Sequence, residues 1–332
     1  MSRSGRAALW LAAGLWLAPV AAAEVPDWRA FRTADGSFAT EVGGDVTDPY
    51  FVNKSLIVAM QAGLDVRAEL HDWLAWLLPR QRPDGGFDRF CGARDGRWVA
   101  CLPADADDAM AATTLQLLAL ARQRGWLPAR QAARVRAAER AADGLLRSLR
   151  DDANGLYRVF APQPTYYLMD NLEVLEALRA RRDPAAGPLA SAIRRHFRDG
   201  AQWRASIPPI EPRRFYPHAL AHSYLWHSGL LSASESGADI AAWLAQHSAT
   251  WLDRQTDHFA WGIVAWNVHA LAPAEAGCWR LSVRQSPARL GWTVLDAMAD
   301  AALAHRGVPA VCARRLAASS TRHEAATSES PT

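Results

Sequence analysis

Apolar residues recur every three or four positions through most of the chain. After Asn53, for example, Leu56, Ile57 and Met60 occupy the i+3, i+4 and i+7 positions of one helical face. Repeats of this kind predict helices that begin near Asn53, Val66, Asp108, Pro128, Tyr167, Ala185, Pro217, Ala238, His258 and Ala288. Turn-rich segments such as RPDGGFDRF separate them, and strand patterns are limited to short stretches such as LYRVF and WRLSV. The pattern therefore predicts an all-α protein built from successive helical hairpins.

Every second predicted helix carries a polar residue in its first turn, ahead of an apolar stripe. These residues are Asn53, Asp108, Asn171, His218 and His258. Each alone would be an ordinary helix start, but their recurrence at alternate helices indicates a shared geometry. If these helices form an inner ring with parallel axes, their first turns meet at one end. The pattern thus predicts an α/α toroid with a polar mouth and an incomplete or irregular last hairpin.

The two ends of the chain differ in composition from the middle. The first residues, MSRSGRAALWLAAGLWLAPVAAAEV, combine a basic start, a short apolar run and small residues before Glu24, which is typical of a secretory signal peptide. An uncleaved membrane anchor is the alternative, and no later segment is apolar enough to span a membrane. We expect a signal peptide at 1–23, a single toroid domain at 24–312 and a disordered tail at 313–332. The protein is expected to be exported, either to the periplasm or out of the cell.

The cysteine count is even, which in an exported protein predicts disulfides. Of the three possible connectivities, the sequential one is favoured, Cys91–Cys101 with Cys278–Cys312, because the first bond would pin a loop rich in arginine and glycine. No cysteine has a histidine or a second cysteine at zinc spacing, so no metal site is predicted.

Charge and motifs narrow the possible ligands. The net charge of +3 is spread along the chain without a basic stripe, which disfavours nucleic acid as a partner. The chain contains no G-x-x-x-x-G-K-[ST] loop and no G-x-G-x-x-G between a strand and a helix, so no nucleotide and no cofactor is implied.

The stretch CLPADADDAM places three aspartates where a long apolar helix begins. Asp105 best suits the N-cap, which needs one acceptor for free backbone N–H groups. Asp107 and Asp108 lie about 100° apart around the helix, so only one of them can point straight into a pocket. Asp108 lies on the apolar stripe and is expected to face that pocket. The helix dipole lowers the pKa of both carboxyls, whereas their mutual repulsion raises one of them.

Five segments, taken in order and spacing, resemble the six-hairpin, (α/α)6-barrel glycosidase-like superfamily, and within it a group of exported proteins. They are DPYFVNKSLIVAMQAG, WLAWLLPRQRPDGGF, DADDAMAATTLQLLALAR, YYLMDNLEVLEALRA and RFYPHALAHSYLW. The similarity runs from about Asp48 to Trp226. It implies a toroid that cleaves carbohydrate chains with carboxylates at its mouth, acting on a polysaccharide or oligosaccharide.

By position, the resemblance implies catalytic carboxylates at Asp107, Asp108 and Asp170. It further implies that Tyr50, Asn53, Tyr167, Asn171, Tyr216 and His218 line the site. Glycoside hydrolysis needs two carboxyl groups across the scissile bond, one of them protonated. Asp170 is the expected partner of Asp108, with Asp48 and Glu41 as alternatives.

Some aromatic residues are expected to bind sugar, because sugars stack their apolar CH faces on flat rings. The chain has 15 tryptophans, most of which we expect in the core. Those expected nearest the mouth are Trp98, Trp226, Trp261 and Trp266.

Three alternatives to a glycoside hydrolase remain open from the sequence. A polysaccharide lyase on the same fold would use a tyrosine or histidine as base, drawn from Tyr167, Tyr216, His218 and His222, with Asn171 neutralising a uronate. A non-catalytic polysaccharide-binding or export-scaffold protein would keep the fold without the chemistry. Finally, QRPDGGF and DADD resemble motifs of class II terpene cyclases, in which Asp107 would protonate an alkene, although export and motif spacing argue against that reading.

Overall fold

The structure is a computed structural model that describes residues 24–92, 97–200, 202–255 and 259–312. The predicted signal peptide at 1–23, the predicted tail at 313–332 and His258 lie outside these ranges. The described residues form eleven α-helices: α1 (Pro49–Ala62), α2 (Arg67–Leu77), α3 (Asp107–Gln123), α4 (Ala132–Leu149), α5 (Leu168–Ala180), α6 (Ala186–Phe197), α7 (Leu220–Leu225), α8 (Ala233–Trp251), α9 (Gly262–Val268), α10 (Pro273–Gln285) and α11 (Val294–His305). Shorter helical turns are η1 (Trp28–Phe31), η2 (Leu78–Arg80), η4 (Ala129–Gln131), η5 (Phe215–Ala219) and η6 (Pro287–Arg289).

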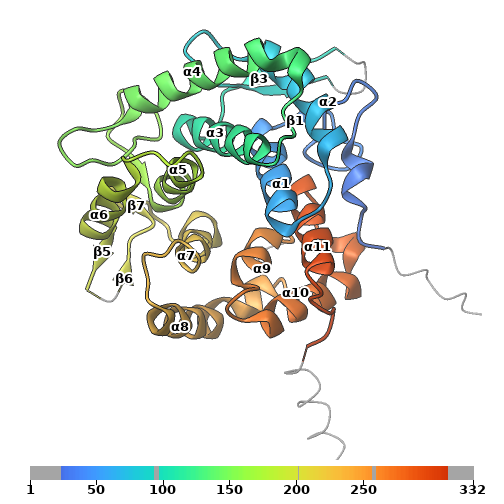
Figure 1. Cartoon of the computed structure of the whole chain (residues 1–332). Coiled ribbons are helices and arrows are strands. Elements are labelled where there is room, and N and C mark those ends of the chain that lie inside the picture. Colours follow the sequence, from blue (N-terminus) through green and yellow to red (C-terminus); the bar gives the residue numbers. More distant parts are fainter. Residues whose placement is uncertain (1–23, 93–96, 201, 256–258, 313–332) are drawn as a thin grey trace, which may run out of the picture.

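Alternate helices form two concentric rings (Figure 1). The odd-numbered helices α1 to α11 surround the centre, each in contact with the next, and the even-numbered helices lie outside them. Burial explains this sorting: α3 is buried continuously over residues 108–119, whereas α4 buries one stripe that includes Val135, Ala138 and Ala142. The arrangement confirms the all-α toroid predicted from the sequence.

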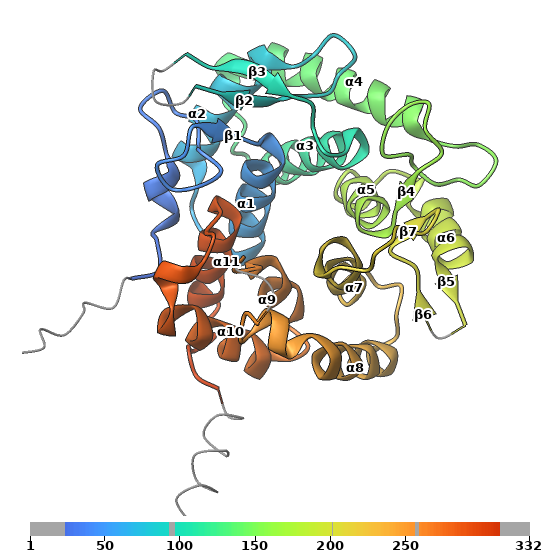
Figure 2. The same cartoon turned by 180° about the vertical axis from the view of Figure 1, so that it is seen from behind.

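The ring closes between the first and last helices, since α11 packs against both α1 and α9. No α-helix follows α11 within the described residues. In place of an outer partner, η1 from the N-terminal segment packs on α11, as the view from behind also shows (Figure 2). The last hairpin is therefore irregular, as the sequence predicted.

The two ends of the toroid differ in the length of their connections. At the C-terminal ends of the inner helices short turns lead to the outer helices, for example residues 63–66 between α1 and α2. The long connections all lie at the N-terminal ends of the inner helices, and they contain β1 (Val46–Thr47), β2 (Arg89–Cys91), β3 (Val99–Leu102), β4 (Tyr166–Tyr167), β5 (Arg198–Asp199), β6 (Gln202–Trp203) and β7 (Ser206–Ile207). Antiparallel pairing joins β1, β2 and β3 into one sheet, β4 with β7, and β5 with β6. We call this end the mouth and the opposite end the base.

Several predicted elements differ from the structure, among them two expected strands and the start of α1. The WRLSV stretch was expected to be a strand, but it lies within α10, a helix that the sequence pattern missed. Its alternation of Trp279, Leu281 and Val283 imitates a strand, yet Trp279 and Val283 are four residues apart and share one buried helical face. The LYRVF stretch forms only an isolated bridge at Tyr157. Helix α1 begins earlier than predicted, because Asp48 caps it and Pro49 occupies its first position.

Two disulfides brace the long connections and the end of the fold. Cys91 bonds Cys101 across the β2–β3 loop, and Cys278 of α10 bonds Cys312. This is the sequential pairing that the sequence favoured. Within the described ranges, no helix is long and apolar enough to cross a membrane.

Candidate active site at the mouth of the toroid

Two aspartates from neighbouring inner helices meet at the centre of the mouth. Asp108 is in the first turn of α3 and Asp170 is in the first turn of α5. Their side chains are buried, at 0% and 1% exposure, and the two carboxyl groups lie close enough to shift each other's pKa. The Oδ2 atom of each is buried without a hydrogen-bond partner among the described residues, so a proton on one carboxyl group could bridge the two. Two carboxyl groups can share a hydrogen bond only if one of them carries a proton.

Burial of both carboxyl groups, together with repulsion between negative charges, favours the protonated form of one of them. Burial raises the pKa of Asp108 well above its usual range, and the charge of Asp170 raises it further. Burial likewise raises the pKa of Asp170, followed by the charge of Glu173. A helix N-terminus favours the ionised form, and the Ala109 N–H donates to Asp108 Oδ1 at 2.9 Å. Burial and the charge of Asp170 outweigh the helix N-terminus and the Ala109 N–H. The expectation from the sequence that the helix dipole lowers the pKa is therefore wrong for Asp108.

A second layer of polar groups lies one helical turn below the aspartates. Glu173 of α5 accepts a hydrogen bond from the Tyr50 hydroxyl at 2.8 Å and pairs with Lys54 Nζ at 2.9 Å. The Tyr50 and Tyr224 hydroxyls lie 3.2 Å apart, and the Lys54 ammonium lies 4.8 Å from the centre of the Tyr224 ring. The negative charge of Glu173 therefore reaches the aspartate pair, while Lys54 balances part of it.

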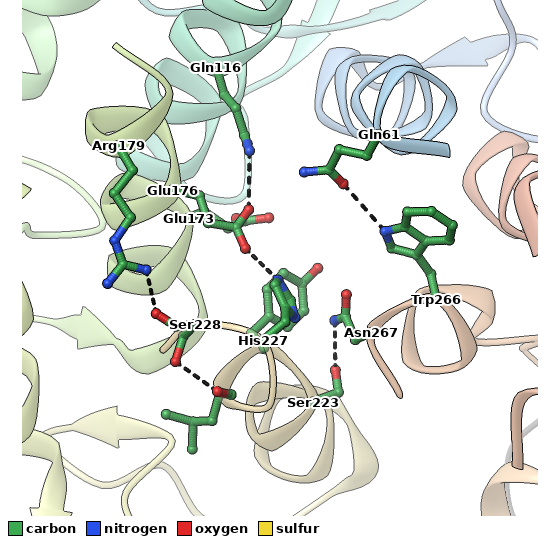
Figure 3. Close-up of polar contacts among 12 residues, drawn as sticks. Gln61, Gln116, Glu173, Glu176, Arg179, Ser223, His227, Ser228, Trp266 and Asn267 are labelled. Carbon is green, nitrogen blue, oxygen red and sulfur yellow. Dashed lines mark hydrogen bonds and ion pairs between the residues drawn. The ribbon is translucent and has the colours of Figure 1, made fainter. Parts of the chain in front are cut away.

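Lys54 stays charged although it is only 4% exposed. Burial alone would lower its pKa, but the charges of Glu173 and Glu176 raise the pKa above the usual lysine value. Glu176 lies one turn further along α5, 3.8 Å from Lys54, with its carboxylate held between Gln116 and His227 (Figure 3). Burial opposes ionisation of Glu176, but Lys54 and His227 lower its pKa to about 2.

Asp105 does not cap α3, so that prediction is wrong. The N-cap is Ala106, which makes no side-chain cap hydrogen bond. The Asp105 carboxylate instead pairs with Arg89 of β2 at 2.5 Å, and its side chain is 66% exposed. It stays close enough to Asp170 to raise the pKa of that group. The reason is tertiary: the antiparallel β2–β3 pair brings Arg89 to the rim of the mouth.

Asp107 and Asp108 point in different directions. Asp107 pairs with Arg82 at 2.7 Å, and the same guanidinium also binds Asp84 and Asp88. Asp107 therefore belongs to a charged cluster behind the mouth and does not contact the Asp108–Asp170 pair in the structure.

Asp48 and Tyr50 form the start of α1 at the mouth. Asp48 accepts a hydrogen bond from the Tyr50 N–H at 3.0 Å and lies 3.9 Å from Arg89. Burial raises the pKa of Asp48 to about 6. Asp48 is thus a helix cap with a perturbed pKa, and Tyr50 reaches Glu173 rather than the rim.

Aromatic rings form the outer rim. Tyr216 is 43% exposed, and its ring stacks on Trp261 with centroids 6.1 Å apart and an angle of 12° between the planes. Tyr167 immediately precedes α5 and is half-buried. Burial, followed by the charge of Asp170, raises the pKa of both tyrosines. Trp261 adopts a left-handed conformation, with φ of 51°, and the next N–H, that of Gly262, donates to Asp296 at 2.7 Å.

Several residues expected at the site are occupied by structural contacts. Asn53 is fully buried and bonds Thr114 and Trp73. Asn171 holds the backbone of Tyr157 through both of its amide atoms. The sequence pattern could not separate these roles from substrate binding, because a polar first turn looks the same in either case.

Other expected residues lie at the edge of the site or away from it. His218 contacts the backbone of Arg214 and Ile210 in the loop before α7, and His222 lies 3.5 Å from Asp239. Trp98 donates to Asp35 and Trp226 donates to Asp239. Trp266 is near the C-terminal end of α9 and bonds Gln61 at the end of α1, so it lies at the base and not at the mouth. Glu41 is exposed and forms a bridge with Thr293.

Four residues of the site escaped the sequence analysis: Lys54, Glu173, Tyr224 and Arg89. Signals for two of them exist in the sequence. Lys54 is the only lysine of the chain and interrupts an apolar helix, and Glu173 follows Asp170 by three residues on an otherwise apolar face.

Two further observations concern metal binding and a second cleft. Within the described residues, no group of three or more His, Cys, Asp or Glu side chains could hold a metal ion. A cleft of about 550 Å³ lies away from the mouth, lined by residues 24–29 and by Arg284, Ala297, Asp300 and Ala301. Arg284 and Asp300 form an ion pair there. Neither Asp108 nor Asp170 lines this cleft, so it is separate from the aspartate pair.

No protein-family model matches the chain, and no curated protein sequence matches it. Among solved structures, the chain is similar to the crystal structure of a D-mannose isomerase, with a TM-score of 0.56. The superposition covers 83% of this chain and 93% of the isomerase chain at 10% sequence identity. At this identity the likeness shows a shared fold, the all-α toroid expected from the sequence.

Proposed function

We propose that the protein is an exported carbohydrate-active enzyme that cleaves a polysaccharide or oligosaccharide at the mouth of the toroid, by hydrolysis. The observation that carries this proposal is the buried pair of Asp108 and Asp170, whose pKa values are both raised. Hydrolysis of a glycosidic bond needs a protonated carboxyl group near neutral pH, and burial is the usual means of keeping one. The two disulfides support export, because such bonds persist in oxidising compartments.

The aspartate pair acts as one acid in this proposal. Carboxyl groups that flank a scissile bond are about 5–5.5 Å apart in retaining enzymes and about 6.5–9.5 Å apart in inverting enzymes. Asp108 and Asp170 are both buried and close enough to shift each other's pKa, so they do not leave room for a sugar between them. We therefore assign the pair the role of proton donor and look for the second carboxylate elsewhere.

Asp105 is the best candidate for that second carboxylate. Among the carboxylates whose charge acts on Asp170, Glu173 is buried behind the pair, whereas Asp105 is exposed. Its pairing with Arg89 orients it. An exposed carboxylate next to the pair suits the activation of a water molecule.

A carbohydrate substrate is supported by two further observations. The stacked rings of Tyr216 and Trp261 offer an exposed flat surface beside the acid, and aromatic surfaces of this kind suit the apolar faces of sugar rings. The D-mannose isomerase of similar fold acts on a sugar.

The rival reactions fit the mouth less well. A lyase would need a tyrosine or histidine base. The pKa of Tyr167 and that of Tyr216 are both raised. His218 contacts the backbone of Ile210, and His222 lies 3.5 Å from Asp239. Alkene protonation by Asp107 would need a neutral carboxyl in an aromatic cavity, whereas Asp107 is paired with Arg82. A binding or scaffold role does not explain why a buried proton is held at the mouth.

The test is a paired assay on the mature chain with its disulfides intact. Wild type, Asp108→Asn and Asp105→Asn are incubated with neutral and acidic polysaccharides, and with free hexoses to detect isomerisation. New reducing ends and the absorbance of unsaturated uronates are followed together. Asp107→Asn is the matched control, because it changes the neighbouring carboxyl outside the pair.

We expect reducing ends without unsaturated products. Asp108→Asn should lower the rate by about 10²-fold or more, as expected for loss of a general acid, while Asp107→Asn stays near wild type. Unsaturated products would assign the protein to the lyases, and an interconverted hexose without chain cleavage would assign it to the isomerases. Absence of any product from folded wild type would favour the binding or scaffold function.

A further inference from the structure

The base of the toroid carries a second group of inward-facing polar side chains, separate from the mouth. They come from five inner helices or the turns that follow them, and we call them the basal ring: Gln61, Gln116, Glu176, His227, Trp266 and Asn267. Figure 3 shows these side chains arranged around the central axis. We propose that the basal ring binds a small neutral polyol of monosaccharide size, independently of the reaction proposed at the mouth.

Part of the ring is already joined by hydrogen bonds. The Gln116 side-chain N–H donates to Glu176 at 3.2 Å, and His227 contacts the other Glu176 oxygen at 2.5 Å. The Trp266 indole N–H donates to the Gln61 oxygen at 3.4 Å, and the Asn267 amide donates to Ser223 at 3.2 Å. These contacts fix the orientation of the ring but use only some of its polar atoms.

The polar atoms of the basal ring that make no hydrogen bond indicate that a ligand binds there. Gln116 is 3% exposed, and its Oε1 is buried with no hydrogen-bond partner among the described residues. A buried acceptor without a donor destabilises the fold, so such a group is normally satisfied by water or by a ligand. The Asn267 amide oxygen and the Gln61 amide nitrogen also face the axis in Figure 3, and the hydrogen bonds of these two side chains to other described residues use neither atom.

The charge of the ring restricts the class of ligand. Glu176 is ionised, and Lys54 and His227 already balance it. An anionic ligand would be repelled by Glu176, and a cation would have to displace partners that are in place. The open positions include acceptors on Gln116 and Asn267 and a donor on Gln61, which match hydroxyl groups because a hydroxyl both donates and accepts.

The ring is also reachable from solvent. The His227 side chain is 37% exposed, and Gln61 is exposed at the end of α1. Trp266 is 8% exposed, and its ring stacks on His269 with centroids 4.4 Å apart. A ligand entering past His227 would therefore meet a fixed aromatic edge and three amide side chains.

Calorimetric titration of the mature protein with free hexoses, pentoses and linear alditols tests the proposal. Gln116→Met and Asn267→Leu remove the open acceptors while keeping side-chain volume. Gln123→Met is the matched control, because Gln123 lies on the same helix and donates to Ala180 O outside the ring. Circular dichroism checks that each variant is folded.

We expect saturable binding of at least one polyol to wild type. Each ring variant should weaken the dissociation constant roughly three- to tenfold, the range expected for one lost neutral hydrogen bond, and Gln123→Met should leave it unchanged. Because the two ring variants lie on different helices, failure of one to fold leaves the other as the test. Absence of saturable binding across the panel would mean that water alone fills the ring and would overturn the proposal. Binding that changes in Asp108→Asn but in neither ring variant would place the sugar at the mouth and would also overturn it.

Discussion

The carboxyl groups of Asp108 and Asp170, from two neighbouring helices of the inner ring, are buried together and shift each other's pKa. Each lies in the first turn of its helix, where the helix dipole favours a negative charge. Complete burial outweighs the dipole, so one carboxyl keeps its proton. A protonated carboxyl beneath an aromatic rim is the feature from which the proposed chemistry follows.

The shared proton should make stability depend on pH. A carboxyl whose pKa is raised by folding binds its proton more tightly in the folded state, so that state holds more protons than the unfolded chain above about pH 4. The free energy of unfolding should therefore fall as the pH rises from about 4 toward 8. Asp108→Asn should flatten this fall, because it removes one titrating group while its amide can still donate to Asp170. Urea denaturation near pH 5 and pH 8 measures both slopes, and equal slopes in the two proteins would contradict the shared proton.

The chain's single lysine should be a large contributor to stability. Lys54→Met leaves Glu173 and Glu176 buried without their ammonium partner, and we expect a loss of about 3–5 kcal/mol in the free energy of unfolding. The double variant Lys54→Met/Glu173→Gln should recover part of that loss because it removes one unpaired charge. Arg67→Met, at an exposed cation–π contact with Trp126, serves as the control and should change stability by about 1 kcal/mol or less. An equal, small effect in both single variants would show that the buried pair is not needed.

Glu176 should stabilise the fold in the opposite pH range. Its folded-state pKa of about 2 is below the value of about 4.3 for a free glutamate. Its contribution is therefore present above about pH 4 and is lost as the pH falls through about 2. The difference in unfolding free energy between wild type and Glu176→Gln should be a few kcal/mol near pH 7 and should shrink on acidification. Denaturation curves from about pH 3 to pH 7 measure it, and a difference that grows in acid would contradict the assignment.

The two disulfides should contribute unequally to the free energy of unfolding. Cys278–Cys312 closes 34 residues and both cysteines are buried, whereas Cys91–Cys101 closes 10 residues in an exposed hairpin. The chain-entropy estimate gives the longer loop about 1 kcal/mol more stabilisation. Thermal unfolding of the two double-alanine variants, Cys278→Ala/Cys312→Ala and Cys91→Ala/Cys101→Ala, compares them. A larger loss from the hairpin pair would mean that the β2–β3 loop is held more by its disulfide than by packing.

The aromatic rim should act on substrate binding more than on the chemical step. Tyr216→Ala removes the ring that stacks on Trp261, and we expect KM to rise roughly tenfold with kcat within about threefold of wild type. Tyr216→Phe keeps the ring and should stay close to wild type in KM. A loss of kcat in Tyr216→Phe would instead give the hydroxyl a part in the chemistry, and the rim would have to be reassigned.

The fold and part of the mouth could be predicted from the sequence because they depend on local patterns. Polar residues recur in the first turns of alternate helices, and this recurrence predicted an inner ring whose ends meet. The apolar stripe of α3 carries Asp108 inward by helical geometry alone, as expected. The role of Asp105 was missed because Arg89, which binds it, reaches the rim only through pairing of β2 with β3.

Other features depend on contacts that no local pattern reveals. The Asp108–Asp170 pair requires the packing of α3 against α5. The ion pair of Lys54 and Glu173 joins α1 to α5 across the axis. Trp266 was expected at the mouth, but α9 is so short that this residue already lies toward its C-terminal end.

Direct observation of the shared proton tests the account most sharply. Carbon-13 spectra of aspartate-labelled wild type and Asp108→Asn, recorded from about pH 4 to pH 9, report the ionisation of each carboxyl group. The account predicts one aspartate carboxyl that remains protonated near pH 7 in wild type and whose signal is absent from Asp108→Asn. Complete ionisation of both Asp108 and Asp170 below about pH 6 would contradict the shared proton and, with it, the acid proposed for the mouth.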